Sequence, residues 1–272
     1  MAARHPAVPF SSVSSPGESL KSDTRLTVSS NEIVVFAAGS LVDSFAELQT
    51  AFERQEPATE VRLRFASADQ LRRAIGDGAR AEVFASADWA QMREAQHQGL
   101  IVGEPRAFAT NRLTLLISRA NPRRISSLAD LARDDLRLAA EHTDAPLTVY
   151  TRALLANLGR APVYGPTLAR QIERALVPTA RTVREIVTQV VDGKADAGIV
   201  YLTDYTPSVQ SFLTSIEIPA DVNVTATYTI ALTRTGTNLE AAAAFVDLVC
   251  SSVGQRILAR WGFGPAAASE AR

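Results

Sequence analysis

Short apolar runs alternate with amphipathic, helix-like segments along the chain from residue 32 onwards. In the first part of the chain, the pattern predicts strands at 32–38, 61–66 and 81–87, and helices at 40–55, 69–78 and 88–99. Strands that alternate with helices form βαβ units, in which parallel strands make a sheet that helices cover on both faces. The pattern therefore predicts an α/β fold with mainly parallel sheets.

A long apolar run at 112–118 has the character of a strand that crosses between two lobes, and a second α/β set follows it. This set comprises helices at 126–133, 146–159 and 182–193, and strands at 136–141, 195–201 and 225–234. The segment 238–262 predicts a closing helix with a break near Gly254.

The composition of the chain excludes some functional classes of protein. The 272 residues carry a net charge of −1 with a pI of about 6.3, whereas nucleic-acid-binding domains are usually strongly basic. Cys250 is the single cysteine, so no disulfide forms within the chain, and the three histidines lack metal-ligand spacing. These features argue against a nucleic-acid partner and against a metal-dependent enzyme.

The sequence contains no run of roughly 18 apolar residues, the length that spans a bilayer. Residues 1–31 are rich in Ser and Pro and lack the continuous apolar segment of a secretory signal. We expect these residues to form a disordered leader, and we expect no membrane insertion.

The predicted ends of the strands favour an anion as ligand. Parallel α/β sheets bind ligands beyond the carboxyl ends of their strands, where helix N-termini present unpaired N–H groups and a partial positive charge. Such junctions occur at Ser40, at 67–69, at 146–148, at 182–185 and at Tyr201. Ser40 is followed by Asp43 in the pattern of a capping box. Because Ser and Thr cap helices in proteins of every function, the pattern alone leaves capping and anion binding both open.

Signatures of catalysis are lacking. The sequence has no P-loop, no G-x-S-x-G elbow and no H-E-x-x-H motif. The letters GFGPAA at 262–267 resemble a dinucleotide fingerprint, but they follow a helix instead of a strand. We therefore expect neither enzymatic activity nor a cofactor.

Taken together, the junctions resemble those of a known family. VFAAGSL, AEVFASAD, NRL before the long strand, VR at the start of a helix, and ADAGIVY followed by Thr203 and Asp204 occur in the order and spacing of molybdate-binding proteins. These proteins are the substrate-binding components of molybdate ABC transporters, and the resemblance covers roughly residues 32–268. It implies a type II periplasmic-binding-protein fold, with a ligand cleft between two α/β lobes that crossing strands join. The expected lobes are 32–112 with 218–268, and 113–217.

The resemblance also implies ligand-binding residues that donate hydrogen bonds without carrying charge. Ser40 would offer its hydroxyl and its backbone N–H. Leu147 and Val183 would offer backbone N–H groups from helix starts in the second lobe, and Tyr201 would offer its phenol hydroxyl. The segment EHTDAPLTV at 141–149 departs from the family's pattern.

The junction at 67–69, after the second predicted strand, departs from the family's pattern as well. Ala68 stands where the family has a ligand serine, although Ser67 lies next to it, and Asp69 follows. A carboxylate about 4 Å from a dianion costs roughly 4 kcal/mol per unit charge at a surface-like dielectric. Either Asp69 turns away to cap its own helix beside Arg72 and Arg73, or the ligand differs from the family's usual one.

The resulting prediction is a protein that binds a tetrahedral oxyanion, molybdate or tungstate, which are two ions of nearly the same size and charge. Molybdenum is then held as an oxyanion, and no side chain is expected to ligate a metal cation directly. By the resemblance, the protein is a monomer outside the cytoplasm and delivers the anion to the membrane permease of an ABC transporter. The lack of a secretory signal and the changes at 68–69 leave a second hypothesis open, a cytoplasmic anion sensor or another soluble binding module on the same fold.

Overall fold

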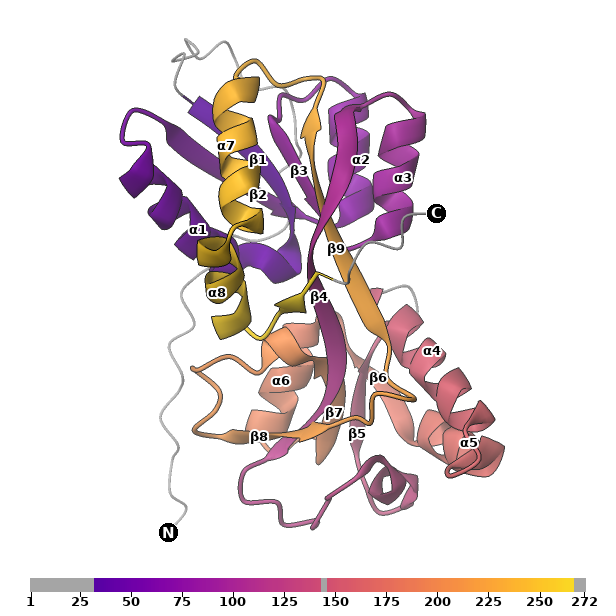
Figure 1. Cartoon of the computed structure of the whole chain (residues 1–272). Coiled ribbons are helices and arrows are strands. Elements are labelled where there is room, and N and C mark those ends of the chain that lie inside the picture. Colours follow the sequence, from indigo (N-terminus) through magenta and orange to yellow (C-terminus); the bar gives the residue numbers. More distant parts are fainter. Residues whose placement is uncertain (1–31, 143–145, 267–272) are drawn as a thin grey trace.

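The computed structural model describes residues 32–142 and 146–266, which form two α/β lobes stacked one above the other (Figure 1). The predicted leader at 1–31 lies outside the described residues. The upper lobe contains β1 (Glu32–Ala38), the 3-10 turn η1 (Gly39–Leu41), α1 (Val42–Gln55), β2 (Glu60–Ala66), α2 (Ala68–Gly76), β3 (Val83–Ser86), α3 (Trp89–His97), α7 (Leu239–Cys250), α8 (Ser252–Arg260) and β10 (Gly264–Pro265).

The lower lobe is built from the middle of the chain. It contains the 3-10 helix η2 (Leu128–Ala132), β5 (Leu138–Glu141), α4 (Pro146–Arg160), α5 (Gly165–Ala175), β6 (Leu176–Ala180), α6 (Val183–Val191), β7 (Ala197–Tyr201), the 3-10 turn η3 (Leu202–Asp204) and β8 (Leu213–Glu217). Two long strands, β4 (Ile101–Ser118) and β9 (Thr225–Thr233), connect the two lobes (Figure 1).

Hydrogen bonding joins the strands in the order β2-β1-β3-β9-β4-β7-β5-β6, and β8 and β10 both pair with β4. Neighbouring strands are parallel from β2 through β1 to β3, and again between β7, β5 and β6. The pairs that involve the crossing strands are antiparallel. The structure is thus two parallel sheets joined by an antiparallel seam, which confirms the α/β class expected from the alternating pattern.

The crossing strand β4 is much longer than the apolar run at 112–118 indicates. Its first part pairs with β9, and the register shifts between Val102 and Arg106, where the irregularity accommodates Gly103 and Pro105. Glycine and proline weaken a sequence-based strand assignment because they are usually confined to strand edges and bulges. For that reason, the pattern reveals only the continuous apolar half of this strand.

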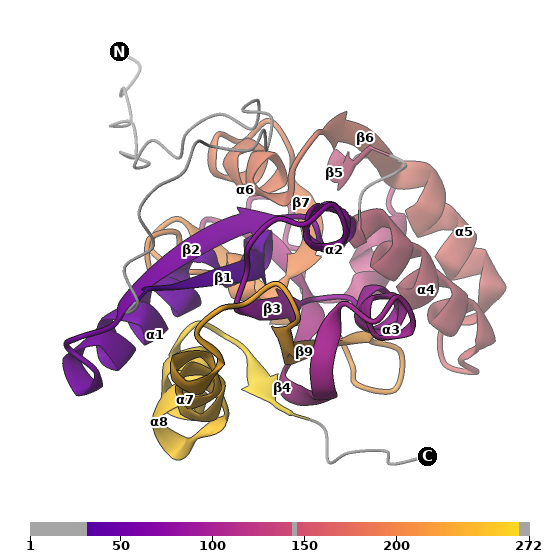
Figure 2. The same cartoon turned by 90° about the horizontal axis from the view of Figure 1, so that it is seen from above.

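Alternate residues of β1 pack against different helix layers. Ile33 and Val35 belong to a buried cluster with Phe45 of α1 and Phe245 of α7. Phe36 belongs to a second cluster formed with α2 and α3, against which the intervening Val34 also packs. Since successive side chains of a strand point to opposite faces, helices cover both faces of this sheet (Figure 2). The near-continuous apolar sequence of the strand follows from this two-sided burial.

In the lower lobe, a third cluster joins β7 and the second half of β4 to α4 and α6. Gly198 of β7 lies against α6, where a Cβ atom would collide with the side chain of Ile186. The cluster extends along the chain from Leu113 to Val222. The lobe boundaries given from the sequence remain a prediction.

Some elements differ from the sequence prediction. Within residues 126–133, expected as an α-helix, only Leu128–Ala132 is helical, and it forms the 3-10 helix η2. The elements α5, β6 and β8 have no counterpart in the predicted set. The closing helix is divided at Ser251 into α7 and α8, whose axes differ by 60°. Within the described ranges, no single helix is long and apolar enough to cross a membrane, and only this bent pair meets the length and composition test.

We predict that Gly254 is required at the bend between α7 and α8. A Cβ atom there would collide with the carbonyl oxygens of Leu248 and Val249, so Gly254→Ala should lower the free energy of unfolding by about 1–3 kcal/mol. Gly76→Ala is the control, because its Cβ would meet nothing closer than Leu100 Cδ1 at 3.7 Å. Urea unfolding measures both variants, and equal stabilities would contradict this explanation of the bend.

Candidate functional site

The ends of the first two strands bring two predicted ligand segments together. β1 and β2 are parallel and in register, with Ala38 beside Ala66. Ser40 follows one strand end and Ser67 follows the other, so both serines lie at the same edge of the upper sheet. This is the edge at which parallel sheets bind ligands.

Ser40 does not cap a helix by its side chain, although the sequence shows the pattern of a capping box. It lies inside η1, and helix α1 begins only at Val42. The Ser40 hydroxyl is instead 2.9 Å from the hydroxyl of Tyr228 in β9. Of the two roles left open for Ser40, helix capping is therefore not the one found, because the chain makes a short 3-10 turn first and leaves the hydroxyl free to reach β9.

Tyr228 is the centre of a buried polar network between the lobes. Its side chain is 1% exposed, and burial raises its pKa to about 12. Asn111 Nδ2 of β4 donates to the Tyr228 hydroxyl at 3.3 Å and to Thr203 Oγ1 of η3 at 2.9 Å. The network thus runs from Ser40 in the upper lobe to Thr203 in the lower lobe.

Asp69 turns back onto the start of its own helix. Ser67 Oγ donates to Asp69 Oδ1 at 2.6 Å, and this hydrogen bond is the largest influence on the pKa of Asp69, which lies below its usual value. Arg73 lies 3.9 Å from the carboxylate on the next turn and lowers the pKa further. The first of the two arrangements foreseen for Asp69 is therefore the one found, and it engages the hydroxyl of Ser67. Ala68 is the first residue of α2 and has no polar side chain to offer.

The lower lobe brings Leu147 and Val183 to one point. Leu147 is the second residue of α4, Val183 is the first residue of α6, and the backbone N–H groups of both donate to the carboxylate of Glu141. Helix N-termini leave such N–H groups without partners within the helix and carry partial positive charge. Two helices from separate parts of the chain therefore present donors to the same negatively charged group.

Glu141 ends strand β5 and is almost enclosed. The residue is 8% exposed, and its Oε2 atom has no hydrogen-bond partner within the described structure. Burial raises the pKa of its carboxyl group above the usual value, and the nearby Glu185 raises it as well, while the two backbone N–H groups oppose this rise. A buried acceptor without a partner is unusual in a folded protein and calls for an explanation.

Tyr201 is the last residue of β7, and it lies between the polar network around Tyr228 and the carboxyl group of Glu141. Its ring packs edge-on against Tyr150 of α4 at a centroid distance of 5.8 Å, and its backbone N–H donates to Asp204 Oδ2 at 3.1 Å. Burial raises the pKa of the Tyr201 phenol strongly, and Tyr228, Tyr150, Asp204 and Glu141 add to this effect. The phenol therefore stays neutral and keeps its proton available for donation.

The structure thus gathers Ser40, Tyr201, Leu147 and Val183 around the junction of the lobes, linked through Tyr228, Asn111 and Glu141. Sequence reasoning missed these three linking residues. Glu141 carried a signal in the sequence, since a charged residue at the end of a buried parallel strand stands at the ligand-binding edge of the sheet. Among the described residues, no group of three or more His, Cys, Asp or Glu side chains is placed to hold a metal ion.

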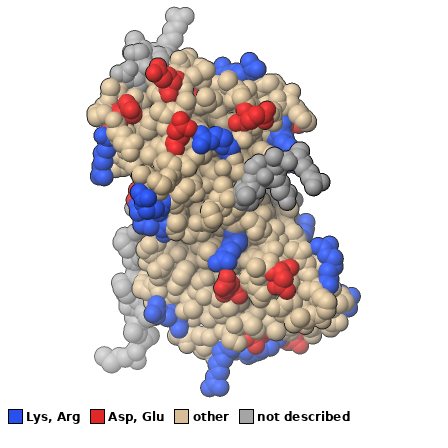
Figure 3. Space-filling view, in the orientation of Figure 1, with Lys and Arg blue, Asp and Glu red and all other residues tan. Residues whose placement is uncertain are grey.

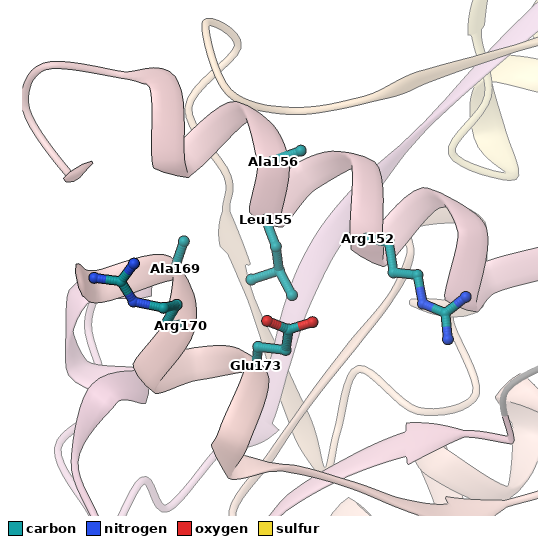
Figure 4. A pocket seen from close by; sticks show the side chains of 6 residues that line it. All are labelled: Arg152, Leu155, Ala156, Ala169, Arg170 and Glu173. Carbon is teal, nitrogen blue, oxygen red and sulfur yellow. The ribbon is translucent and has the colours of Figure 1, made fainter. Parts of the chain in front are cut away.

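Two other features of the surface lie apart from this junction. A groove between α4 and α5 is lined by Arg152, Leu155, Ala156, Ala169, Arg170 and Glu173 (Figure 4). None of the predicted ligand residues lines it. On the face seen in Figure 3, basic and acidic side chains are interspersed and form no extended patch of one sign.

Two α/β lobes, crossing strands, and helix N-termini at the junction define a two-lobed solute-binding protein. Residues 33–264 match the family described as bacterial extracellular solute-binding protein, and the chain belongs to this family. It is 33% identical over 237 residues to the molybdate-binding protein ModA of Mycobacterium tuberculosis, an alignment that covers 87% of this chain and 86% of the relative. These matches confirm the family resemblance drawn from the sequence.

Solved structures agree on the fold. The substrate-binding domain of a putative molybdenum ABC transporter from Clostridium difficile superposes with a TM-score of 0.75 at 24% identity, covering 87% of this chain and 99% of that one. The sulfate-binding protein SubI from Mycobacterium tuberculosis superposes with a TM-score of 0.71 at 18% identity, covering 86% and 87%. Proteins named for different ligands therefore share this fold.

We predict that Asp204 makes stability depend on pH. Burial raises its pKa to about 7, so the folded state binds a proton more tightly than the unfolded state does. The stabilisation from this proton is complete below about pH 4 and is lost as the pH rises towards 7, with a slope of at most about 1.4 kcal/mol per pH unit. Urea unfolding from pH 4 to 7 should show this decline in the wild type, and Asp204→Asn should reduce it.

The matched control is Asp69→Asn, because the pKa of Asp69 is shifted in the opposite direction. Its contribution is present above the unfolded pKa and is lost as the pH falls, so this variant should leave the decline towards pH 7 in place. An unchanged slope in Asp204→Asn would show that Asp204 is not the group responsible.

Proposed function

We propose that this protein binds a tetrahedral oxyanion, molybdate or tungstate, at the junction of its lobes and delivers it to the permease of an ABC transporter. The proposed ligands are Ser40, Leu147, Val183 and Tyr201, with Ser67 and Ala68 at the edge of the site. The relative in Mycobacterium tuberculosis is a molybdate-binding protein by name, and this supports the choice of anion.

The observation that carries the proposal is the convergence of two helix N-termini on one carboxylate. The N–H groups of Leu147 and Val183 both donate to Glu141, so the lower lobe holds a negatively charged group of oxygen atoms at this point. An oxyanion offers the same kind of acceptor, and helix N-termini are common sites for such ions. The donors at this point are backbone amides that carry no formal charge.

The strength of the proposed site is sufficient for a transport protein. Ser40 contributes two donors, and Leu147, Val183 and Tyr201 contribute one each. Hydrogen bonds to a charged group are worth about 1.5–3 kcal/mol each, which gives roughly 8–15 kcal/mol before the costs of ordering. Micromolar affinity requires about 8 kcal/mol. The missing serine hydroxyl at position 68 therefore weakens the site without abolishing it.

We predict that isothermal titration calorimetry detects molybdate and tungstate binding at micromolar Kd or tighter. Ser40→Ala removes a hydroxyl donor and should weaken binding by about 10- to 100-fold. Ser44→Ala is the control, because the Ser44 hydroxyl donates to the Leu41 carbonyl at 3.1 Å. Titrations with sulfate and phosphate establish which anion is preferred, and an absence of binding to molybdate and tungstate would refute the proposed ligands.

A proline at position 183 tests the backbone donor directly. Val183 is the first residue of α6 and follows Thr182, whose backbone is extended (φ −139°, ψ 154°), so proline fits there and removes only the N–H group. Val183→Pro should weaken anion binding by about 10- to 100-fold at little cost in stability.

Ser252→Pro makes the same change at the first residue of α8, after the extended Ser251. This control should bind the anion like the wild type. If Val183→Pro also binds like the wild type, the N–H group of Val183 is not a ligand.

A further inference from the structure

We propose that the oxyanion is bound together with one proton, and that Glu141 is the residue that carries this proton. The inference rests on the proposed function and deepens it, because it names a further residue that determines how the same site accepts its ligand.

The Glu141 side chain occupies the donors of the lower lobe. Its carboxylate accepts from the N–H groups of Leu147 and Val183, and its Oε2 atom is buried without a partner. An oxyanion that approaches these N–H groups must therefore share them with Glu141. The unpartnered Oε2 atom is the part of the carboxyl group that is free to interact with the arriving ion.

The charge on Glu141 determines how well an anion can bind at these two N–H groups. An ionised carboxylate repels a dianion and competes with it for both N–H groups. A protonated carboxyl group carries no charge, and its O–H group becomes a hydrogen-bond donor to an oxygen atom of the anion. Molybdate and tungstate carry no proton of their own at neutral pH, so the proton must come from solution as the anion binds.

The surrounding charges favour this uptake. Glu185 of α6 acts on Glu141, and Glu141 acts in turn on Asp204 of η3 and on Tyr201 at the end of β7. These neighbours are acidic or neutral. The cation Arg184 influences Asp204, but it is not among the groups that shift the pKa of Glu141. An arriving dianion adds more negative charge, and negative charge raises the pKa of a carboxyl group.

Burial already raises the pKa of Glu141, and its two hydrogen bonds from N–H groups act against this rise. Anion binding removes or weakens those hydrogen bonds and adds repulsion. The Kd for molybdate should consequently rise by about tenfold for each pH unit above neutrality, because one proton is taken up for each anion bound.

Proton uptake is measured by calorimetry on the full chain at pH 8 with sodium molybdate, in Tris and in HEPES, which release different heats of ionisation. The difference between the observed enthalpies gives the number of protons, and we expect close to one per anion for the wild type. Glu141→Gln should take up none, should bind with a Kd that is independent of pH from 6.5 to 8.5, and should bind at least about tenfold more tightly than the wild type at pH 8.

Two matched variants separate Glu141 from its neighbours. Glu185→Gln removes a nearby negative charge, and Asp204→Asn removes a second buried carboxyl group, whose own pKa burial raises to about 7. Both variants should retain the uptake. Binding without proton uptake in the wild type, or uptake that disappears in Asp204→Asn and persists in Glu141→Gln, would overturn the inference. An absence of molybdate and tungstate binding in every variant at every pH would instead refute the proposed function.

Discussion

The antiparallel pairing of β4 with β9 determines where every part of the candidate site lies. β4 pairs with β9 as far as Arg112 and with β7 from Leu113 onwards, so a single strand belongs to both sheets. Asn111 is next to this change of partner, and its side chain reaches Tyr228 on β9 and Thr203 after β7. Tyr201 is paired with Leu113 and is therefore held close to the same junction. Residues from distant parts of the sequence meet because one strand carries both lobes.

The second constraint is the positive potential of two helix N-termini that face one point. The fold brings the starts of α4 and α6 together beyond the end of β5, and unpaired N–H groups in a buried place require an acceptor. Glu141 supplies it. By the proposal above, the same residue also sets the conditions under which an external anion binds at this point.

Much of the fold is predictable from local patterns. Apolar runs such as 32–38 and 195–201 correspond to β1 and β7 because these strands are buried on both faces. The amphipathic segment 40–55 largely corresponds to α1. Elements with mixed or polar sequences were not predicted: β6 is exposed over most of its length, and the first part of β4 contains a glycine and a proline. Such segments become strands because neighbouring strands supply hydrogen bonds, which a local pattern does not reveal.

The candidate site was only partly accessible from the sequence, for a similar reason. Helix starts can be recognised by position, which indicated the junctions at 146–148 and 182–185. The family resemblance then singled out Leu147 and Val183 within them. The role of Asp69 depended on the direction of its side chain, which the hydrogen bond from Ser67 decides. Glu141 and Tyr228 act through contacts with residues far away in the sequence, and only the three-dimensional arrangement reveals those partners. The chemistry of strand ends was thus accessible from the sequence, whereas the choice among neighbouring polar side chains was not.

The most direct test of this account is a crystal structure of the protein grown with tungstate, with anomalous diffraction data collected at a tungsten absorption edge. We expect one strong anomalous peak between the lobes, with oxyanion oxygens within hydrogen-bonding distance of the Leu147 and Val183 nitrogens and of Ser40 Oγ, and with the Glu141 carboxyl group against the anion. A peak elsewhere, or an ion in the site with neither helix N-terminus in contact, would contradict the account.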